Sequence, residues 1–208
     1  MDYNPELESG VKYMEFRLTY DGDLRSGGDA SHKHSIRKVF HKQLKQLWQV
    51  TPALVEWSNI DPCDGINKHQ SQLLANSYQR CGYRFVPLVI EEYGVLVSLD
   101  VLFLRPGEPG TIIQAGDIDN RLKVLFDALR MPNNKPELGG YESPDSDEDP
   151  FYCLLLDDKL VASVHVVTDT LLQPSSTSGG PHQQTFDCRL VVTVGIRRYK
   201  PLMWNPFQ

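Results

Sequence analysis

Short apolar segments alternate with turns along the chain, and their lengths are typical of β-strands. The segments predicted to form strands are residues 14–20, 83–90, 95–104, 151–156, 162–167 and 186–196. Elsewhere, apolar residues return at helical spacing. Helices are predicted at residues 35–48, 67–80 and 120–130. This order predicts an α/β fold of the α+β type, in which helices pack against a mixed β-sheet.

Pro87 lies inside one of the predicted strands. Because proline has no N–H to donate, we expect this strand to lie at a sheet edge or to break there. The chain has 208 residues, enough for one domain with a sizeable core, and no obvious linker divides it. We therefore expect residues 1–208 to form a single domain.

The helix predicted at residues 120–130 has two distinct faces. One arc carries the apolar residues Leu122, Leu125, Phe126 and Leu129. A neighbouring arc of roughly 80° carries the polar residues Asp119, Lys123, Asp127 and Arg130. Asp117 precedes the helix in backbone that we expect to be extended, so the carboxylates of Asp117 and Asp119 can converge. Since the N-terminus of a helix favours carboxylates, both can bind a hard cation, with Lys123 close to it.

A second acidic pair, Asp157-Asp158, follows an apolar run and could supply the remaining carboxylate of a Mg²⁺ or Mn²⁺ site. The spacing also allows a purely structural interpretation. In that case Asp119 or Asn120 caps the helix, Lys123 forms ion pairs along it, and the acidic pair is a turn. The combination of all these groups favours the metal site, and such a site indicates phosphodiester chemistry.

The pattern Asp117-x-Asp119-Asn120-x-x-Lys123-x-x-x-Asp127-Ala128-Leu129, followed by Asp157-Asp158-x-x-Val161, resembles the core of RusA-type Holliday junction resolvases. The resemblance covers about residues 95 to 170. In that family a strand leads into the first aspartates, a helix follows, and an Asp-Asp turn opens a further strand. The resemblance therefore implies a RusA-like fold.

The resemblance also implies roles for individual residues. Asp117, Asp119 and Asp158 would be catalytic residues that hold Mg²⁺ or Mn²⁺, and Lys123 would stabilise the charge that develops on the phosphate. The secondary candidates are Asp157, Asn120 and Asp127. Members of the family are homodimers that bind branched DNA and make paired, Mg²⁺-dependent nicks in four-way junctions.

The chain departs from the family pattern in three places. Residues 131–150 form an insertion whose prolines, adjacent glycines and acidic run predict a mobile acidic loop, which could gate the site or be ordinary solvated surface. Residues 114–116 lack the family's basic residues, and residues 19–24 do not match its N-terminal motif. These departures leave open a RusA-fold nuclease that acts on another DNA or on RNA, in a phage-defence or mobile-element setting.

The formal net charge of −6 opposes indiscriminate binding of nucleic acid. Basic residues are nevertheless concentrated around the predicted helix 35–48, mostly on its outward face. The candidate nucleic-acid contacts are Lys33, Arg37, Lys38, His41, Lys42 and Lys45. An ordinary solvated face is the alternative. His32 and His34 raise the possibility of a transition-metal site, which the lack of a third soft ligand nearby disfavours.

The remaining features concern environment and partners. The four cysteines, which are widely spaced without a Cys-x-x-Cys pair, are Cys63, Cys81, Cys153 and Cys188. This spacing argues against a zinc finger or a disulfide framework. No apolar run is long enough to span a bilayer and the N-terminus does not resemble a signal peptide, so we expect a cytoplasmic protein without a membrane partner.

The C-terminal residues 197–207 mix cations with aromatic residues. They could stack on unpaired bases, pack on the core or cover a partner subunit. A non-catalytic module that binds nucleic acid or a protein is the alternative from a different functional class. Retention of three carboxylates and a lysine in the motif favours the enzyme.

Overall fold

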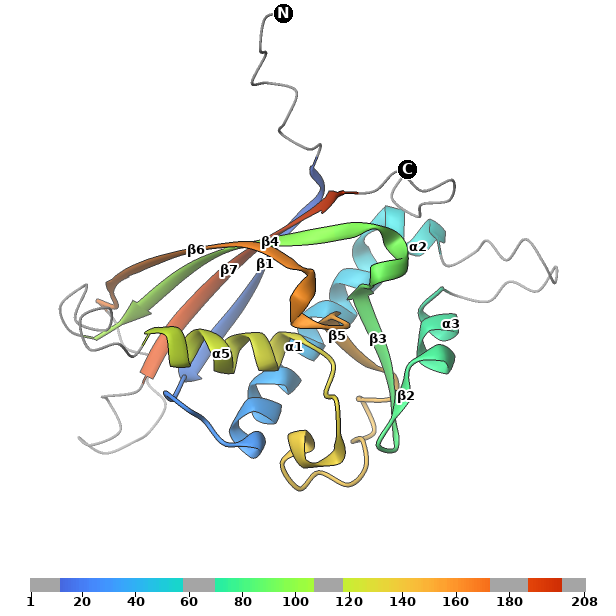
Figure 1. Ribbon diagram of the computed structural model, residues 1–208, viewed down its shortest axis with the longest axis horizontal. Helices are drawn as coiled ribbons and strands as arrows, with labels where there is room; N and C mark the ends of the chain where they lie inside the picture. The colour runs from blue at the N-terminus through green and yellow to red at the C-terminus, as the bar shows by residue number, and fades with distance from the viewer. Residues whose placement is uncertain (1–11, 58–69, 107–117, 173–186, 200–208) are drawn as a thin grey trace, which may run out of the picture.

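The computed structural model describes residues 12–57, 70–106, 118–172 and 187–199. Within these ranges the chain has a mixed α/β fold with two β-sheets (Figure 1). The larger sheet contains β1 (Lys12–Asp23), β7 (Asp187–Arg198), β4 (Val95–Arg105) and β6 (Val161–Thr170), in that order. β7 is antiparallel to both β1 and β4, whereas β6 is parallel to β4.

The smaller sheet has the order β2 (Gln79–Arg80), β3 (Tyr83–Val89) and β5 (Phe151–Leu155). β2 and β3 form a hairpin, and β5 is parallel to β3. Cys81 and Gly82 both have positive φ, the backbone geometry of a tight hairpin turn.

Four α-helices lie within the described residues: α1 (Ala30–Val50), α2 (Pro52–Trp57), α3 (Gln70–Ser77) and α5 (Ile118–Leu129). The three short 3₁₀ helices of this part of the chain are η2 (Glu91–Tyr93), η3 (Lys135–Leu138) and η4 (Asp158–Leu160). None of the described helices is long and apolar enough to cross a membrane.

Local chemistry sets both ends of α1. The carboxylate of Asp29 accepts a hydrogen bond of 2.8 Å from the backbone N–H of His32, which satisfies one donor of the first turn. Thr51 precedes Pro52, and a residue before proline disfavours helical backbone. Thr51 is accordingly extended, and α1 ends at Val50.

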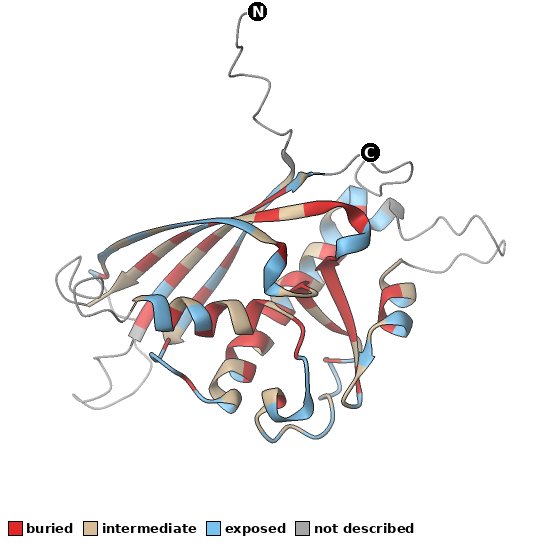
Figure 2. Ribbon diagram, viewed as in Figure 1, coloured by how far each residue is buried: buried red, intermediate tan, exposed pale blue. Residues whose placement is uncertain are grey.

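α1 occupies the centre of the fold, where it contacts β1 of the larger sheet, β5 of the smaller sheet, α5 and η3 (Figures 1 and 2). Because neighbours surround it on several sides, its buried surface is wider than an ordinary apolar stripe. The buried residues of α1 are His34, Ile36, Arg37, Phe40, His41, Leu44 and Trp48.

One face of the larger sheet forms part of the core. Along β4 every second residue is buried, as period-two geometry requires: Val95, Val97, Leu99, Val101 and Phe103. Residues between them are half-buried, except Asp100, which is exposed. β6 is an edge strand of this sheet, and most of its residues are exposed (Figure 2).

The prediction of a mixed α/β fold is confirmed, but the strands form two sheets instead of one. Residues 79–80, predicted to end a helix, form β2 because they turn back in the hairpin with β3. β3 is continuous through Pro87. β2 pairs only with Tyr83 and Arg84, so at Pro87 the described neighbour of β3 is β5 alone.

The segment at residues 131–150, predicted to be a mobile acidic loop or solvated surface, is mostly exposed but packs against the fold at a few points. It contains η3, and Leu138 and Glu148 within it are buried. Gly139 shows how closely the segment approaches α1, because a Cβ at this position would lie 2.3 Å from the backbone nitrogen of Ser31. Composition predicted the exposed majority of this segment, whereas the buried leucine and the close backbone contact depend on tertiary packing.

Candidate active site

The exposed side of α5 carries the motif residues of the predicted nuclease site. Asp119 lies in the first turn, and the side chains of Asp119 and Lys123 are 63% and 72% exposed. One carboxylate oxygen of Asp119 lies 3.9 Å from the Nζ of Lys123. An exposed pair of this kind adds little to stability, so both groups can bind other partners at small cost. Asn120 beside them is also exposed.

The acidic pair lies in the turn between β5 and β6. The Asp157 side chain caps η4 by accepting a 3.0 Å hydrogen bond from the backbone N–H of Lys159. This bond lowers the pKa of the Asp157 carboxyl. Asp158 is exposed. Asp157 therefore shapes the turn, and Asp158 is the more exposed member of the pair.

Backbone contacts join this turn to α5. The N–H of Met131 donates a 2.8 Å hydrogen bond to the carbonyl of Leu155, and η4 contacts α5. The junction is at the C-terminal end of α5, whereas Asp119 lies in the first turn. Asp117 is outside the described residues. Among the residues that the structure describes, no three His, Cys, Asp or Glu side chains gather closely enough to hold a metal ion.

Asp127, a secondary candidate ligand, connects α5 to α1. Its carboxylate accepts hydrogen bonds from the Nζ of Lys33 at 2.8 Å and from a guanidinium nitrogen of Arg130 at 2.7 Å. Partial burial alone would raise the pKa of the Asp127 carboxyl, but these two cations outweigh burial and lower it. Asp127 is thus ionised and held in an interhelical ion pair.

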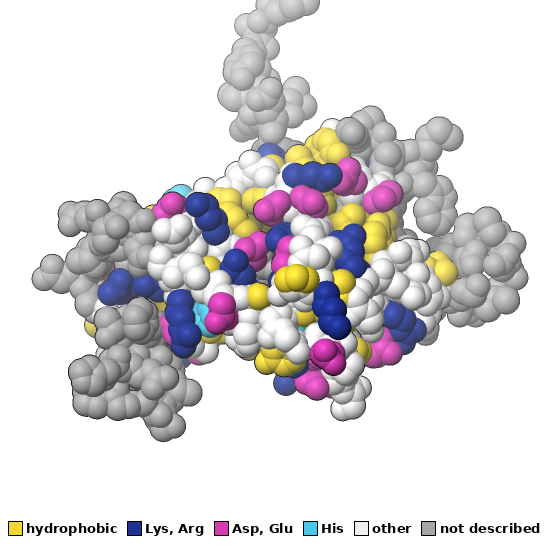
Figure 3. Space-filling model, turned by 60° about the horizontal axis from the view of Figure 1, so that its bottom comes forward, with side chains coloured by type: hydrophobic (Ala, Val, Ile, Leu, Met, Phe, Trp, Pro, Cys, Tyr) yellow, Lys and Arg dark blue, Asp and Glu magenta, His cyan; other side chains and the backbone are white. Residues whose placement is uncertain are grey.

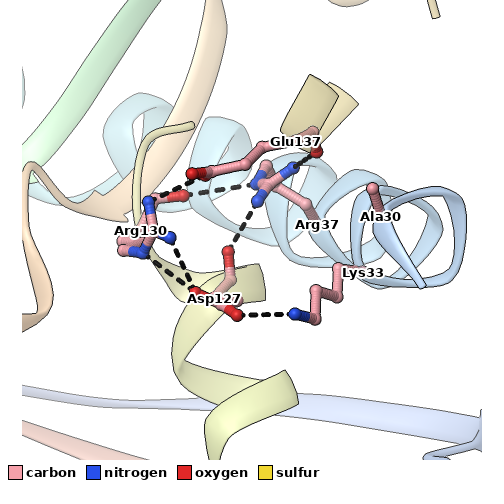
Figure 4. A pocket seen from close by; sticks show the side chains of 6 residues that line it. All are labelled: Ala30, Lys33, Arg37, Asp127, Arg130 and Glu137. Atoms are coloured by element: carbon pink, nitrogen blue, oxygen red, sulfur yellow. Dashed lines mark hydrogen bonds and ion pairs between the residues drawn. The ribbon is translucent and has the colours of Figure 1, made fainter. Parts of the chain in front are cut away.

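Asp127 also lines a cavity of about 150 Å³ between α1, α5 and η3 (Figure 4). The lining side chains converge on this space from the three elements and from the residue that follows α5: Ala30, Lys33, Arg37, Asp127, Arg130 and Glu137. Glu137, which the sequence patterns did not single out, accepts a 2.9 Å hydrogen bond from Arg130. The three cations and two carboxylates pair with one another or with backbone carbonyls, so the cluster holds the helices together.

Arg37 was predicted to point outward and bind nucleic acid, and that orientation is wrong. Its side chain is buried and donates hydrogen bonds to the carbonyls of Asp127 at 2.6 Å and Arg130 at 3.2 Å. The last carbonyls of a helix have no partner within the helix. Arg37 therefore caps α5. Burial lowers the pKa of Arg37 to about 10, so it remains charged at neutral pH.

His41 was also predicted to face outward, and it too is buried. Its Nδ1 accepts a 2.8 Å hydrogen bond from the N–H of Tyr152, and its Nε2 lies 3.2 Å from the carbonyl of Asp147. These partners require a neutral ring with the proton on Nε2. Burial lowers the pKa of His41, in agreement with this protonation state.

His34 forms no surface metal site with His32. Both residues lie in α1, where side chains two positions apart point to opposite sides. The ring of His34 is buried against that of Phe151, with the ring centroids 5.7 Å apart. Burial, together with the nearby charges of Arg37 and Lys38, lowers the pKa of His34 to about 3.

The remaining predicted nucleic-acid contacts have acidic or carbonyl partners within the chain. Lys33 binds Asp127, and the other three lysines contact residues 145–148: Lys38, Lys42 and Lys45. Figure 3 shows basic and acidic side chains intermixed on the face it presents, with no continuous basic stripe. Whether these lysines bind nucleic acid stays a prediction.

Cys81 and Cys153 are free thiols, and Cys153 is buried in the core. Burial raises the pKa of the Cys153 thiol to about 12, so it is unreactive in the folded protein. Cys63, Asp117 and the C-terminal residues 200–207 lie outside the described residues. Comparisons of the chain with protein-family models, curated proteins and solved structures find no match.

Proposed function

We propose that this protein is a Mg²⁺-dependent, structure-selective endonuclease of the RusA type that resolves four-way DNA junctions by paired nicks as a homodimer. The observation that carries the proposal is the exposed pair of Asp119 and Lys123 on α5. This pair belongs to the motif that begins at Asp117 and continues to the Asp157-Asp158 turn, which is joined to the same helix.

The donor groups fit a hard cation. Asp117, Asp119 and Asp158 offer only carboxylate oxygens, which Mg²⁺ and Mn²⁺ prefer over softer ligands. Mg²⁺ commonly takes one or two protein carboxylates and completes its shell with water and substrate phosphate, so an exposed position suits it. When bound, the ion would neutralise phosphate charge and lower the pKa of an attacking water.

Lys123 has the reach to contribute electrostatically. Its Nζ lies 3.9 Å from Asp119, so a phosphate held beside Asp119 would meet this ammonium group. A fixed positive charge that meets the negative charge developing on phosphate is the kind of interaction that dominates many catalytic rate enhancements. Asp127 and Arg37 support the site indirectly, because they hold α5 against α1.

The test is cleavage of labelled four-way junction, fork, linear duplex, single-stranded DNA and RNA, each with Mg²⁺ or with EDTA. We expect paired nicks in the junction that require Mg²⁺. Asp119→Asn should reduce the rate about 100-fold or more. Asp100→Asn is the matched control, because Asp100 is also an exposed carboxylate but lies on the larger sheet.

The other outcomes discriminate between the remaining functions. Metal-dependent cutting of another DNA or of RNA would keep the chemistry and replace the junction with that substrate. Cutting that survives EDTA or Asp119→Asn would refute the proposed site. Binding of nucleic acid without any cutting would favour a non-catalytic module.

A further inference from the structure

Three lysines of α1 form a row that contacts residues 145–149. We name Lys38, Lys42 and Lys45 the lysine row, and residues 145–149 the acidic segment. The three positions lie on one face of α1, separated along its axis by about 6 Å and about 4.5 Å. The row and the segment, which contact each other in the fold, are about one hundred positions apart in sequence.

Each lysine of the row has a partner in the acidic segment. The Nζ of Lys38 lies 2.6 Å from a carboxylate oxygen of Asp145 and 2.9 Å from one of Glu148. The Nζ of Lys42 lies 4.0 Å from the carboxylate of Asp147. Lys45 donates a 2.6 Å hydrogen bond to the backbone carbonyl of Asp147. Oxygen acceptors of the chain itself therefore bind the ammonium groups of Lys38 and Lys45, whereas Lys42 is 70% exposed and faces the Asp147 carboxylate at a longer distance.

The carboxylates of the segment differ in exposure. The Glu148 side chain is only 3% exposed, whereas those of Asp145 and Asp147 are 68% and 55% exposed. Glu148 also accepts a 3.0 Å hydrogen bond from the backbone N–H of Asp145, so it is part of the folded segment. Asp145 and Asp147 lie at the surface, where solvent and a competing anion can reach their lysine partners.

Other contacts hold the segment independently of these two surface carboxylates. The hydroxyl of Tyr83 donates to the carbonyl of Ser143 at 2.9 Å, and Arg84 forms a two-pronged pair with Asp149 at 2.8 and 2.9 Å. The His41 ring also contacts the carbonyl of Asp147. Neutral substitutions at Asp145 and Asp147 should therefore remove charge from the surface while the segment stays folded.

We propose that the lysine row is a binding surface for the phosphates of DNA and that the acidic segment masks it. Asp145 and Asp147 compete with DNA phosphates for the same ammonium groups, because carboxylate and phosphate oxygens accept the same charge-assisted hydrogen bonds. The mask weakens general attraction to DNA and leaves recognition to the region of α5. The inference shares its partner, DNA, with the proposed function, but it does not depend on cleavage.

The test measures binding of a short fluorescein-labelled DNA duplex by fluorescence anisotropy, in EDTA and at a series of salt concentrations. The variant is the full chain with Asp145→Asn and Asp147→Asn. The matched control, Asp100→Asn with Asp169→Asn, changes the net charge equally on two exposed residues of the larger sheet. We expect about tenfold tighter binding for the first variant only, and a salt slope steeper by about one, since Lys42 loses its carboxylate partner whereas Glu148 still pairs with Lys38.

A second variant removes the charges of the lysine row as well as those of the acidic segment. Lys38→Gln, Lys42→Gln and Lys45→Gln, added to the unmasked variant, should abolish the increase in affinity. An equal increase in the control variant would mean that net charge, and not masking, is responsible. An increase that survives the three lysine substitutions, or no binding by any variant, would also overturn the proposal.

The single variant Asp147→Asn tests the proposal even if the double variant fails to fold. The described contacts of Lys45 and His41 use the backbone carbonyl of Asp147, which this substitution keeps. We expect a smaller increase in affinity, about threefold, and wild-type affinity in this variant would count against the mask. Cleavage assays separate the two proposals, since tighter binding without nicking would refute only the nuclease, and nicking without tighter binding only the mask.

Discussion

Acid should destabilise this protein because two buried histidines must be neutral in the fold. The pKa of His34 falls from its ordinary value of 6.5 to about 3, mainly because its ring is buried and secondly because Arg37 and Lys38 are near. Between these two values the unfolded chain binds a proton that the folded chain excludes. The free energy of unfolding therefore rises with pH across this window and is lost as the pH falls.

The size of the effect follows from linkage. Lowering the pH from 7 to 5 protonates His34 in the unfolded chain but not in the fold, which costs about 2 kcal/mol of stability from this residue alone. The lowered pKa of His41 adds to the loss in the same direction. His41 would also lose the hydrogen bond from Tyr152 on protonation, because its Nδ1 could no longer accept.

Urea unfolding followed by tryptophan fluorescence at both pH values measures this loss. In His34→Phe the ring stacking can persist while the titrating group is removed. We expect the difference in unfolding free energy between the two pH values to shrink by about 2 kcal/mol, whatever the substitution costs at neutral pH. The control is His165→Phe at an exposed histidine of β6. An unchanged pH dependence in His34→Phe would refute the reasoning.

Three further predictions concern stability and reactivity. Arg37→Met should lower the unfolding free energy by about 3 kcal/mol, measured by urea unfolding, because the carbonyls that end α5 lose their buried partner; a loss near zero would mean that water replaces the guanidinium. Gly139→Ala should lower the free energy of unfolding by more than about 3 kcal/mol, because its Cβ would collide with the backbone of α1. Gly140 has open space around it, so Gly140→Ala should lower this free energy by only about 1 kcal/mol. Equal melting temperatures for the two variants would contradict the close contact at Gly139. Cys153 should react with a thiol reagent only on unfolding, and labelling of Cys153 as fast as that of the half-buried Cys81 would show that the core is open.

Helix α5 shows how far the pattern of residues could predict a local element. Of the four apolar positions predicted to face the core, Leu125 and Leu129 are buried, whereas Leu122 and Phe126 are half-buried. Its polar positions predicted the exposed side, on which Asp119 and Lys123 lie. Periodicity decides burial for these residues, whereas contacts with α1 and η3 partly cover Asp127 and Arg130 of the predicted polar arc. Whether Asp119 and Asp158 share a metal ion depends on tertiary distances that periodicity does not contain.

Helix α1 shows where the same reasoning fails. Its basic residues were expected to share one solvated face, but Arg37 and His41 are buried and Lys38 is mostly covered. The helix lies between parts of both sheets and beneath the acidic segment, so more of its circumference is enclosed than its apolar residues indicate. Charged and polar side chains can be buried there because each meets a partner from a distant segment.

The sequence by itself determined most of the local elements, because backbone preferences and hydrophobic periodicity act over a few neighbouring residues. It also contains the motif from Asp117 to Asp158, which predicted metal-dependent phosphodiester chemistry. Only the tertiary structure decided that Arg37 caps α5, that Leu138 and Glu148 are buried, and that residues 145–148 pair with lysines of α1. Those outcomes depend on ion pairs and close contacts between segments far apart in the chain, and no local pattern of residues encodes such distances.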